Sequence, residues 1–268
     1  MAFPLIIVGG GRMGAALAQG LLTSGFCAAA DMAIVEVSRE RRDELSAEFS
    51  GVTILASVEL EHISATSGVV LCVKPDHAEA TARVLGALGT MRLLSVVAGL
   101  STARLEAAMP GPVAVIRSMP NTPVVVGKGA SAIAGGAHVV KDDLDCADAV
   151  LSSVGVVVRL AEKNMDAVTG LSGPMPAYLL LVVEALIEAG VHQGLSRDVS
   201  KKLVVATFEG TGALLAMTGE SPEELRAQVT SPGGTTAAGL RMLEGRAVRA
   251  AFLEAVAAAA ERSRQLGR

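Results

Sequence analysis

The first half of the chain alternates short apolar runs with amphipathic segments of helical period. The apolar runs are rich in Val, Ile and Leu, without polar alternation, which is typical of strands buried on both faces. We expect strands at 4–8, 32–37, 52–55, 68–73, 92–97 and 114–117, and helices at 13–24, 39–49, 76–88 and 102–109. This alternation predicts an α/β fold: a Rossmann-type, doubly wound parallel sheet covered by helices on both faces.

The pattern changes near residue 160. Before that point we expect antiparallel edge strands at 124–126 and 130–133 and a helix at 141–152. After it the chain has helical period almost throughout, and we expect helices at 176–193, 197–217, 222–229, 235–243 and 247–265. The sequence therefore predicts two domains, an α/β domain over 1–160 and an all-helical domain over 161–268.

The segment 177–187 is apolar nearly all round, so as a helix it must be buried on every side. A small helical domain achieves this most simply if a second subunit covers one face, and we therefore expect an obligate homodimer. The uninterrupted apolar run, 177–183, ends at Glu184. Because a spanning helix needs about 20 apolar residues, we expect no membrane segment.

Composition excludes several classes of function. The 268 residues carry 23 basic and 27 acidic side chains, a net charge of −4, with no basic tract that includes aromatic residues, which argues against nucleic-acid binding. The three cysteines are far apart and form no CxxC pair, as is usual in a reducing compartment, so we expect a cytoplasmic protein. The four histidines lack metal-ligand spacing, and we expect no metal site.

A glycine-rich loop follows the first expected strand. Residues 9–14, GGGRMG, fit the pattern G-x-G-x-x-G and open the first expected helix. Glycines there permit a tight turn and a close approach of backbone N–H groups to a pyrophosphate, which the helix N-terminus stabilises. The position of the loop in an alternating α/β half predicts a dinucleotide site.

The second expected strand leaves the choice of dinucleotide open. Glu36 follows Gly14 by 22 positions, close to where an acidic residue holds the ribose 2′-hydroxyl of NAD. Ser38 and Arg39 come next, and a hydroxyl with a guanidinium suits the 2′-phosphate of NADP. If Glu36 faces the ribose, NAD is favoured, and if it faces away, NADP is favoured.

Four further loops combine glycine, proline, charged or polar residues in patterns that a simple connection between two elements does not require: 73–75, 95–99, 117–123 and 230–236. The first two follow expected strands, at the edge of the sheet where open α/β proteins bind ligands. The last, TSPGGTT, places two glycines and flanking hydroxyls before an expected helix. Free N–H groups at a helix N-terminus bind anions, and a loop without Lys or Arg suits a compact carboxylate.

These motifs, in this order, resemble those of the pyrroline-5-carboxylate reductases over nearly the whole chain. The most specific is VTSPGGTTAAGL at 229–240. The other segments that carry the resemblance are 9–14, 73–75, 95–99, 117–123, 166–173 and 184–195, together with Arg262 and Ser263.

The resemblance implies reduction of Δ1-pyrroline-5-carboxylate, a cyclic imine carboxylate, to L-proline by NADPH, with NADH as the alternative donor. It also implies a Rossmann domain and a helical dimerisation domain, with the dimers often arranged in rings. By position, the dinucleotide would be held by Gly9, Gly11, Arg12, Met13, Gly14, Ser38, Arg39, Ser57, Val73, Lys74, Pro75, Ala98, Gly99 and Asn121. The substrate pocket would be lined by Glu162, Ser231, Gly233, Gly234, Thr235 and Thr236.

A cyclic imine accepts hydride at C5 only when its nitrogen is protonated or strongly hydrogen-bonded. Thr236 is the residue we expect to act there, and we treat it as the catalytic residue. A threonine hydroxyl is too weak an acid to donate a proton unaided. We therefore expect Thr236 to orient the nitrogen and to relay a proton from water, with proximity providing much of the acceleration.

The sequence departs from the family at two places. Pro174 and Met175 stand where the family has a Ser-Gly pair, which removes a backbone donor and adds volume beside the expected pocket. Ser57 stands near where an Asn is common. Two other functions stay open: a reductase of a different cyclic imine acid, and a catalytically silent regulator that binds dinucleotide.

Overall fold

The computed structural model describes residues 2–64 and 66–267. Two compact units divide the chain: the first contains Met1–Pro174 and Ala257–Arg268, and the second contains Met175–Val256. The chain therefore leaves the first unit at 174 and returns to it for its last turns of helix. These limits differ from the boundary expected at residue 160, and the division into domains at that residue stays a prediction.

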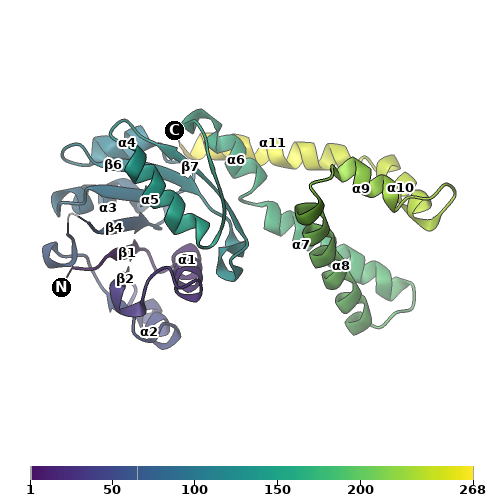
Figure 1. Ribbon diagram of the computed structural model, residues 1–268, viewed down its shortest axis with the longest axis horizontal. Coiled ribbons are helices and arrows are strands. Elements are labelled where there is room, and N and C mark those ends of the chain that lie inside the picture. The colour runs from purple at the N-terminus through teal and green to yellow at the C-terminus, as the bar shows by residue number, and fades with distance from the viewer. Residues whose placement is uncertain (1, 65, 268) are drawn as a thin grey trace. The chain divides into compact units, whose positions relative to one another are not determined.

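The first unit is built on one eight-stranded sheet in the order β3-β2-β1-β4-β5-β6-β7-β8 (Figure 1). All neighbouring strands are parallel except β6 and β7, which are antiparallel. The strands are β1 (Leu5–Val8), β2 (Met32–Val35), β3 (Thr53–Leu55), β4 (Gly68–Leu71), β5 (Arg92–Ser95), β6 (Ala114–Met119), β7 (Gly129–Gly135) and β8 (Gly155–Arg159). The expected Rossmann-type sheet is confirmed.

Alternate residues of each central strand enter two separate cores. Ile7 and Ile34 belong to the core that α1, α2 and α5 cover, whereas Ile6 and Val69 belong to the core beneath α3 and α4. Both faces of the sheet are thus apolar, which explains the continuous runs in the sequence. The helices of this unit are α1 (Arg12–Thr23), α2 (Arg39–Glu48), α3 (Pro75–Ala87), α4 (Thr102–Ala108), α5 (Lys141–Ser152) and α6 (Met165–Leu171).

One expectation for the sheet edge is wrong, and one strand was not expected. The segment 124–126 is part of a 3-10 helix, η3 (Thr122–Val126), rather than a strand, because Pro123 lacks an N–H for a ladder and Val124 is fully buried beside α1. Strand β8 was not expected. It pairs parallel to β7, and a side chain at Gly155 would collide with the Gly129 carbonyl.

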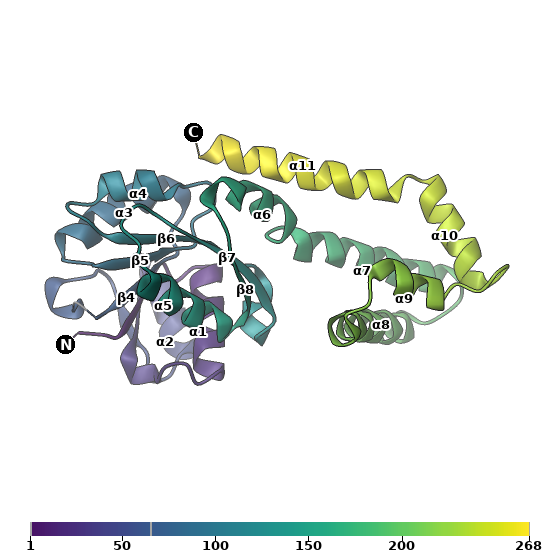
Figure 2. The ribbon, with the colours of Figure 1, turned by 45° about the horizontal axis from the view of Figure 1, so that its top comes forward.

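The second unit is helical, as expected, and lacks a core of its own. It contains α7 (Met175–His192), α8 (Arg197–Thr218), α9 (Pro222–Gln228), α10 (Thr235–Gly245) and the first part of α11 (Val248–Leu266). Helices α7 and α8 pack side by side (Figure 2). Among the described residues 175–256, only Ser200 is buried, and apolar side chains such as Leu181 are 67% exposed.

One helical stretch, 162–192, is long and apolar enough to cross a membrane by length and composition alone. This finding does not contradict the expectation of no membrane segment, because it rests on length and composition alone. One such helix is a weak indication, because a helix that forms an interface with another protein chain has the same composition.

Candidate functional site

A cavity of about 710 Å³ opens at the carboxyl ends of β1, β2 and β4. Strand β1 lies between β2 and β4, so the crossover connections leave it in opposite directions. Open α/β sheets bind ligands at such a switch point. The lining comes from the ends of the strands and from α3, and includes Gly9, Gly11, Glu36, Ser57, Val73, Lys74 and His77.

The glycine-rich loop forms the floor of this cavity. Gly9 has φ +108°, and a side chain there would lie 2.6 Å from the Cys72 carbonyl oxygen. A side chain at Gly14 would collide with the Gly9 carbonyl, whereas Gly11 has open space around it. Gly11 is also the N-cap of α1 and provides no capping side chain. The N-terminus of α1 is therefore free of side-chain obstruction at Gly11, which fits the approach of a dinucleotide pyrophosphate.

Glu36 faces this cavity, directly after β2. Its carboxylate accepts hydrogen bonds from the Gly10 N–H at 3.1 Å and from the Ser38 N–H at 2.9 Å. The neighbouring Arg41 and Arg42 point their guanidinium groups elsewhere. Arg41 donates to the Gly10 carbonyl, and Arg42 donates to the carbonyls of Glu36 and Val37.

Cys72 lines the cavity between β4 and α3. Desolvation by burial raises the pKa of its thiol to about 12. The group is therefore a neutral thiol at physiological pH, and it contributes apolar surface rather than a nucleophile.

The predicted dinucleotide residues do not all line the cavity. Those that line it are Gly9, Gly11, Ser57, Val73 and Lys74. Arg12, Met13 and Gly14 are in α1, Ser38 is the N-cap of α2, and Arg39 and Pro75 begin α2 and α3. Ala98, Gly99 and Asn121 lie in the loops that follow β5 and β6.

Two of these residues have structural partners. Gly99 has φ +77° and is buried under the C-terminal end of α11, where an added Cβ would lie 2.8 Å from the Leu266 Cβ. The Asn121 amide accepts from the Ala130 N–H at 2.8 Å and donates to the Ser172 carbonyl at 3.2 Å. Asn121 therefore holds β7 and the end of α6 together.

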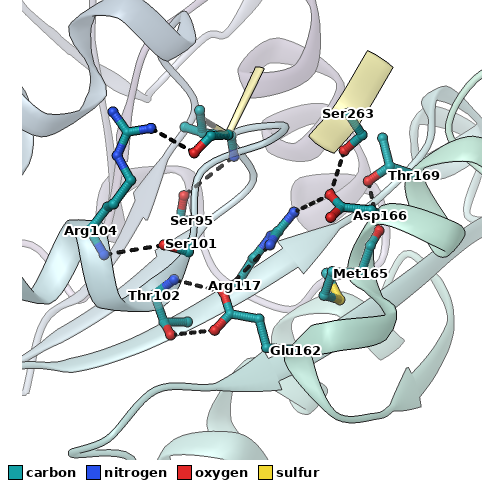
Figure 3. A network of polar contacts seen from close by, with 12 residues as sticks. Ser95, Ser101, Thr102, Arg104, Arg117, Glu162, Met165, Asp166, Thr169 and Ser263 are labelled. Atoms are coloured by element: carbon teal, nitrogen blue, oxygen red, sulfur yellow. Dashed lines mark hydrogen bonds and ion pairs between the residues drawn. The ribbon is translucent and has the colours of Figure 1, made fainter. Parts of the chain in front are cut away.

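A polar network at β6 was not foreseen (Figure 3). Arg117, only 6% exposed, lies 3.5 Å from the Glu162 carboxylate and 3.3 Å from that of Asp166. Both oxygens of Glu162 also accept 2.7 Å hydrogen bonds from Thr102, one from its N–H and one from its hydroxyl. Ser263 of α11 donates to Asp166 at 2.7 Å. One buried cation thus connects β6, α4, α6 and α11.

Glu162, which we predicted to line the substrate pocket, is a member of this network. Glu162 opens the short helix η4 (Glu162–Asn164), and its carboxylate holds the N-terminus of α4. The residue is therefore a bridge within the first unit. The sequence indicates this role only weakly, because Arg117 precedes Glu162 by 45 positions and Asp166 by 49 positions.

The 230–236 loop belongs to the second unit. Gly233 has φ +70°, and the Gly234 N–H donates to the Ser231 carbonyl at 3.1 Å, which makes a tight turn into α10. Gly234 is the N-cap of α10, without a capping side chain, and the side chains of Thr235 and Thr236 are exposed. The loop thus ends at a helix N-terminus without a capping side chain, and anion binding there stays a prediction.

Comparison with known proteins gives a consistent result. Residues 162–266 match the family model of pyrroline-5-carboxylate reductase dimerisation, and residues 4–99 match that of coenzyme F420-dependent NADP oxidoreductases. The first match shows that the helical region is of a self-associating type.

Curated relatives match the chain over its full length. The pyrroline-5-carboxylate reductase of Corynebacterium melassecola is 42% identical, covering 98% of both chains, and that of Synechocystis is 39% identical over all of both. The crystal structure of Plasmodium falciparum pyrroline carboxylate reductase with NADP bound has a TM-score of 0.87 at 30% identity, covering 99% of this chain and 98% of that one. The chain therefore belongs to the pyrroline-5-carboxylate reductase family.

Proposed function

We propose that this protein reduces Δ1-pyrroline-5-carboxylate to L-proline, with hydride from NADPH and with NADH as the alternative donor. The observation that carries the proposal is the full-length similarity to reductases of this name in bacteria and plants. The cavity at the switch point of the sheet supports the dinucleotide, because its floor is backbone that approaches without side-chain obstruction.

The first unit holds the dinucleotide in this account. Gly9, Gly11 and the first turn of α1, with Arg12, Met13 and Gly14, face the pyrophosphate, and Ser38, Arg39 and Ser57 face the adenosine ribose. The loops that end β4, β5 and β6, with Val73, Lys74, Pro75, Ala98, Gly99 and Asn121, form the nicotinamide side. The bound dinucleotide supplies the hydride that the imine carbon C5 accepts.

The 230–236 loop binds the substrate in this account. The N–H groups at the start of α10, by Gly233, Gly234 and Thr235, take the carboxylate, because a helix N-terminus stabilises negative charge. The Thr236 hydroxyl orients the imine nitrogen and relays a proton from water, and Ser231 completes the loop. Glu162, which the family resemblance assigns to the substrate pocket, holds the N-terminus of α4 within the first unit.

We further propose an obligate homodimer, with rings of dimers as the larger assembly. Helices α7 and α8 expose apolar side chains such as Leu181 and Leu203, and the described part of the second unit buries almost nothing by itself. A second copy would remove this surface from water. Leu181→Glu should therefore lower the mass found by light scattering from dimer to monomer, with the exposed Leu60→Glu of the first unit as the control.

A specific feature favours a second candidate, a reductase of another cyclic imine acid. Pro174 and Met175 form the N-terminus of α7, so any donor that a Ser-Gly pair offers there is changed. Turnover of the five-membered 5-carboxylate should be compared with that of the 2-carboxylate and of the six-membered imine. Preference for the 5-carboxylate supports the reduction of Δ1-pyrroline-5-carboxylate as the function. Preference for either of the other imines overturns it. Tight dinucleotide binding without any turnover would instead support a silent regulator.

A further inference from the structure

We propose that Glu36 sets the choice of dinucleotide: its fixed negative charge lowers the affinity for NADPH and admits NADH as a second donor. The inference deepens the proposed function and rests on the dinucleotide site assigned there. Glu36 lies one residue beyond β2 and lines the same cavity as Gly9, Gly11 and Ser57. In a Rossmann fold the end of this strand faces the adenosine ribose.

The Glu36 carboxylate is held in place. One oxygen accepts from the Gly10 N–H of the glycine-rich loop, and the other accepts from the Ser38 N–H at the start of α2. Both donors are backbone groups, which do not rotate as side chains do. The charge therefore stays at the mouth of the cavity when a ligand arrives, and the remaining lone pairs of the carboxylate stay available to a hydroxyl.

No cation neutralises this carboxylate among the residues that the structure describes, since none of their ion pairs includes Glu36. Arg41 donates to Gly10 and pairs with Glu44, and the Arg42 guanidinium donates to two backbone carbonyls. The two arginines thus support the loop from outside the cavity. A ribose 2′-hydroxyl can donate to the carboxylate, whereas a 2′-phosphate dianion would meet an uncompensated like charge.

Arg39 explains why NADPH still binds. It opens α2, is exposed, and takes part in no ion pair within the described part of the chain. A guanidinium there is available to a phosphate oxygen. The chain thus combines a repelling carboxylate with an attracting guanidinium at the same ribose, and the ratio of affinities reports the balance between them.

The decisive variant is Glu36→Gln, which removes the charge at nearly constant volume. The dissociation constants of NADPH and NADH are measured from the fluorescence of the reduced nicotinamide. We expect the NADPH-to-NADH affinity ratio to rise about tenfold or more, as removal of one charge near a phosphate implies. Glu40→Gln, a matched change in the first turn of α2, should leave the ratio within about twofold. If the NADPH-to-NADH affinity ratio of Glu36→Gln also stays within about twofold of the wild-type ratio, the inference is overturned.

A second measurement on the unaltered protein covers the case in which Glu36→Gln disturbs the loop. Adenosine 2′,5′-bisphosphate and adenosine 5′-monophosphate compete with NADH, and we expect the bisphosphate to bind no more than about threefold more tightly. An advantage of about a hundredfold for the bisphosphate would contradict a repelling carboxylate. Both measurements report binding alone. Loss of pyrroline-5-carboxylate turnover with the expected binding ratios would therefore overturn the proposed function and leave this inference intact.

Discussion

The hydroxyl of Ser263 in α11 donates a 2.7 Å hydrogen bond to the carboxylate of Asp166 in α6, 97 positions earlier in the chain. Ser263 is 2% exposed, and the same carboxylate faces Arg117 at 3.3 Å. The last helix is thus tied back to the first unit by a hydrogen bond to a charged group, the stronger kind. This contact is one of several that join the end of α11 to the first unit, with the approach of Gly99 to Leu266 and the hydrogen bond from Arg104 to the Gly267 carbonyl.

Ser263→Ala should lower the free energy of unfolding by about 1–3 kcal/mol, because the Asp166 carboxylate loses a buried donor. The measurement is urea denaturation at one fixed protein concentration, since association adds to apparent stability. Ser46→Ala is the control: its exposed hydroxyl bonds to a carbonyl within α2, so the change should stay within about 0.5 kcal/mol. Equal losses in the two variants would show that the Ser263 contact has no special weight.

Arg117→Met should destabilise the protein by about 3 kcal/mol, because it leaves two partly buried carboxylates without their cation. Arg159→Met is the matched control. Arg159 also faces two carboxylates, those of Asp145 and Asp148, but in an exposed position where water screens the charges. Thermal unfolding should therefore shift clearly for the first variant and little for the second. Similar shifts would contradict the role given to the network.

Gly11→Ala should weaken dinucleotide binding without loss of stability. The space around Gly11 is open in the protein alone, so a methyl group fits, but it would stand where a pyrophosphate approaches. We expect the dissociation constant of NADPH to rise about tenfold or more while the unfolding temperature is unchanged. Gly14→Ala should differ by losing stability as well, because its methyl group collides with the Gly9 carbonyl. Unchanged NADPH binding in Gly11→Ala would place the pyrophosphate elsewhere.

Thr236→Ala should lower kcat about tenfold to a hundredfold, since the imine nitrogen loses the group that orients it. The dissociation constant of NADPH should not change, because Thr236 belongs to the substrate loop rather than to the switch-point cavity. Thr236→Ser keeps the hydroxyl and should recover most of the rate. Collapse of NADPH binding in the alanine variant would mean that the loop does not serve the substrate.

The sequence predicted the sheet well because the central strands are apolar on both faces and the glycine-rich loop marks the first crossover. It missed β8 although Val156, Val157 and Val158 form an apolar run, because the run is short, follows Gly155 and is partly exposed at the edge of the sheet. It assigned 124–126 to a strand because the valines suggested one, and the effect of Pro123 on backbone pairing was underweighted. The edge of the sheet is where local signals are weakest.

The roles of the site residues stay predictions. Gly9, Gly11 and Lys74, which the motifs assigned to the dinucleotide, line the cavity at the switch point of the sheet, because motif spacing reflects local backbone geometry. The α3 side of the cavity, including His77 and Thr81, was not predicted, since its residue types carry no motif. The Arg117 network was missed for a different reason: its members come from four distant segments, and only the folded chain brings them together.

In the proposed reaction, hydride passes from the nicotinamide to C5 of pyrroline-5-carboxylate and gives proline. The most direct test supplies NADPH with deuterium at the transferred C4 position and analyses the product by mass spectrometry. We expect proline that carries a single deuterium at C5, and proline without deuterium at C5 when unlabelled NADPH is used in deuterated water. Proline without deuterium at C5, or no proline from a folded dimer that binds NADPH, would contradict it.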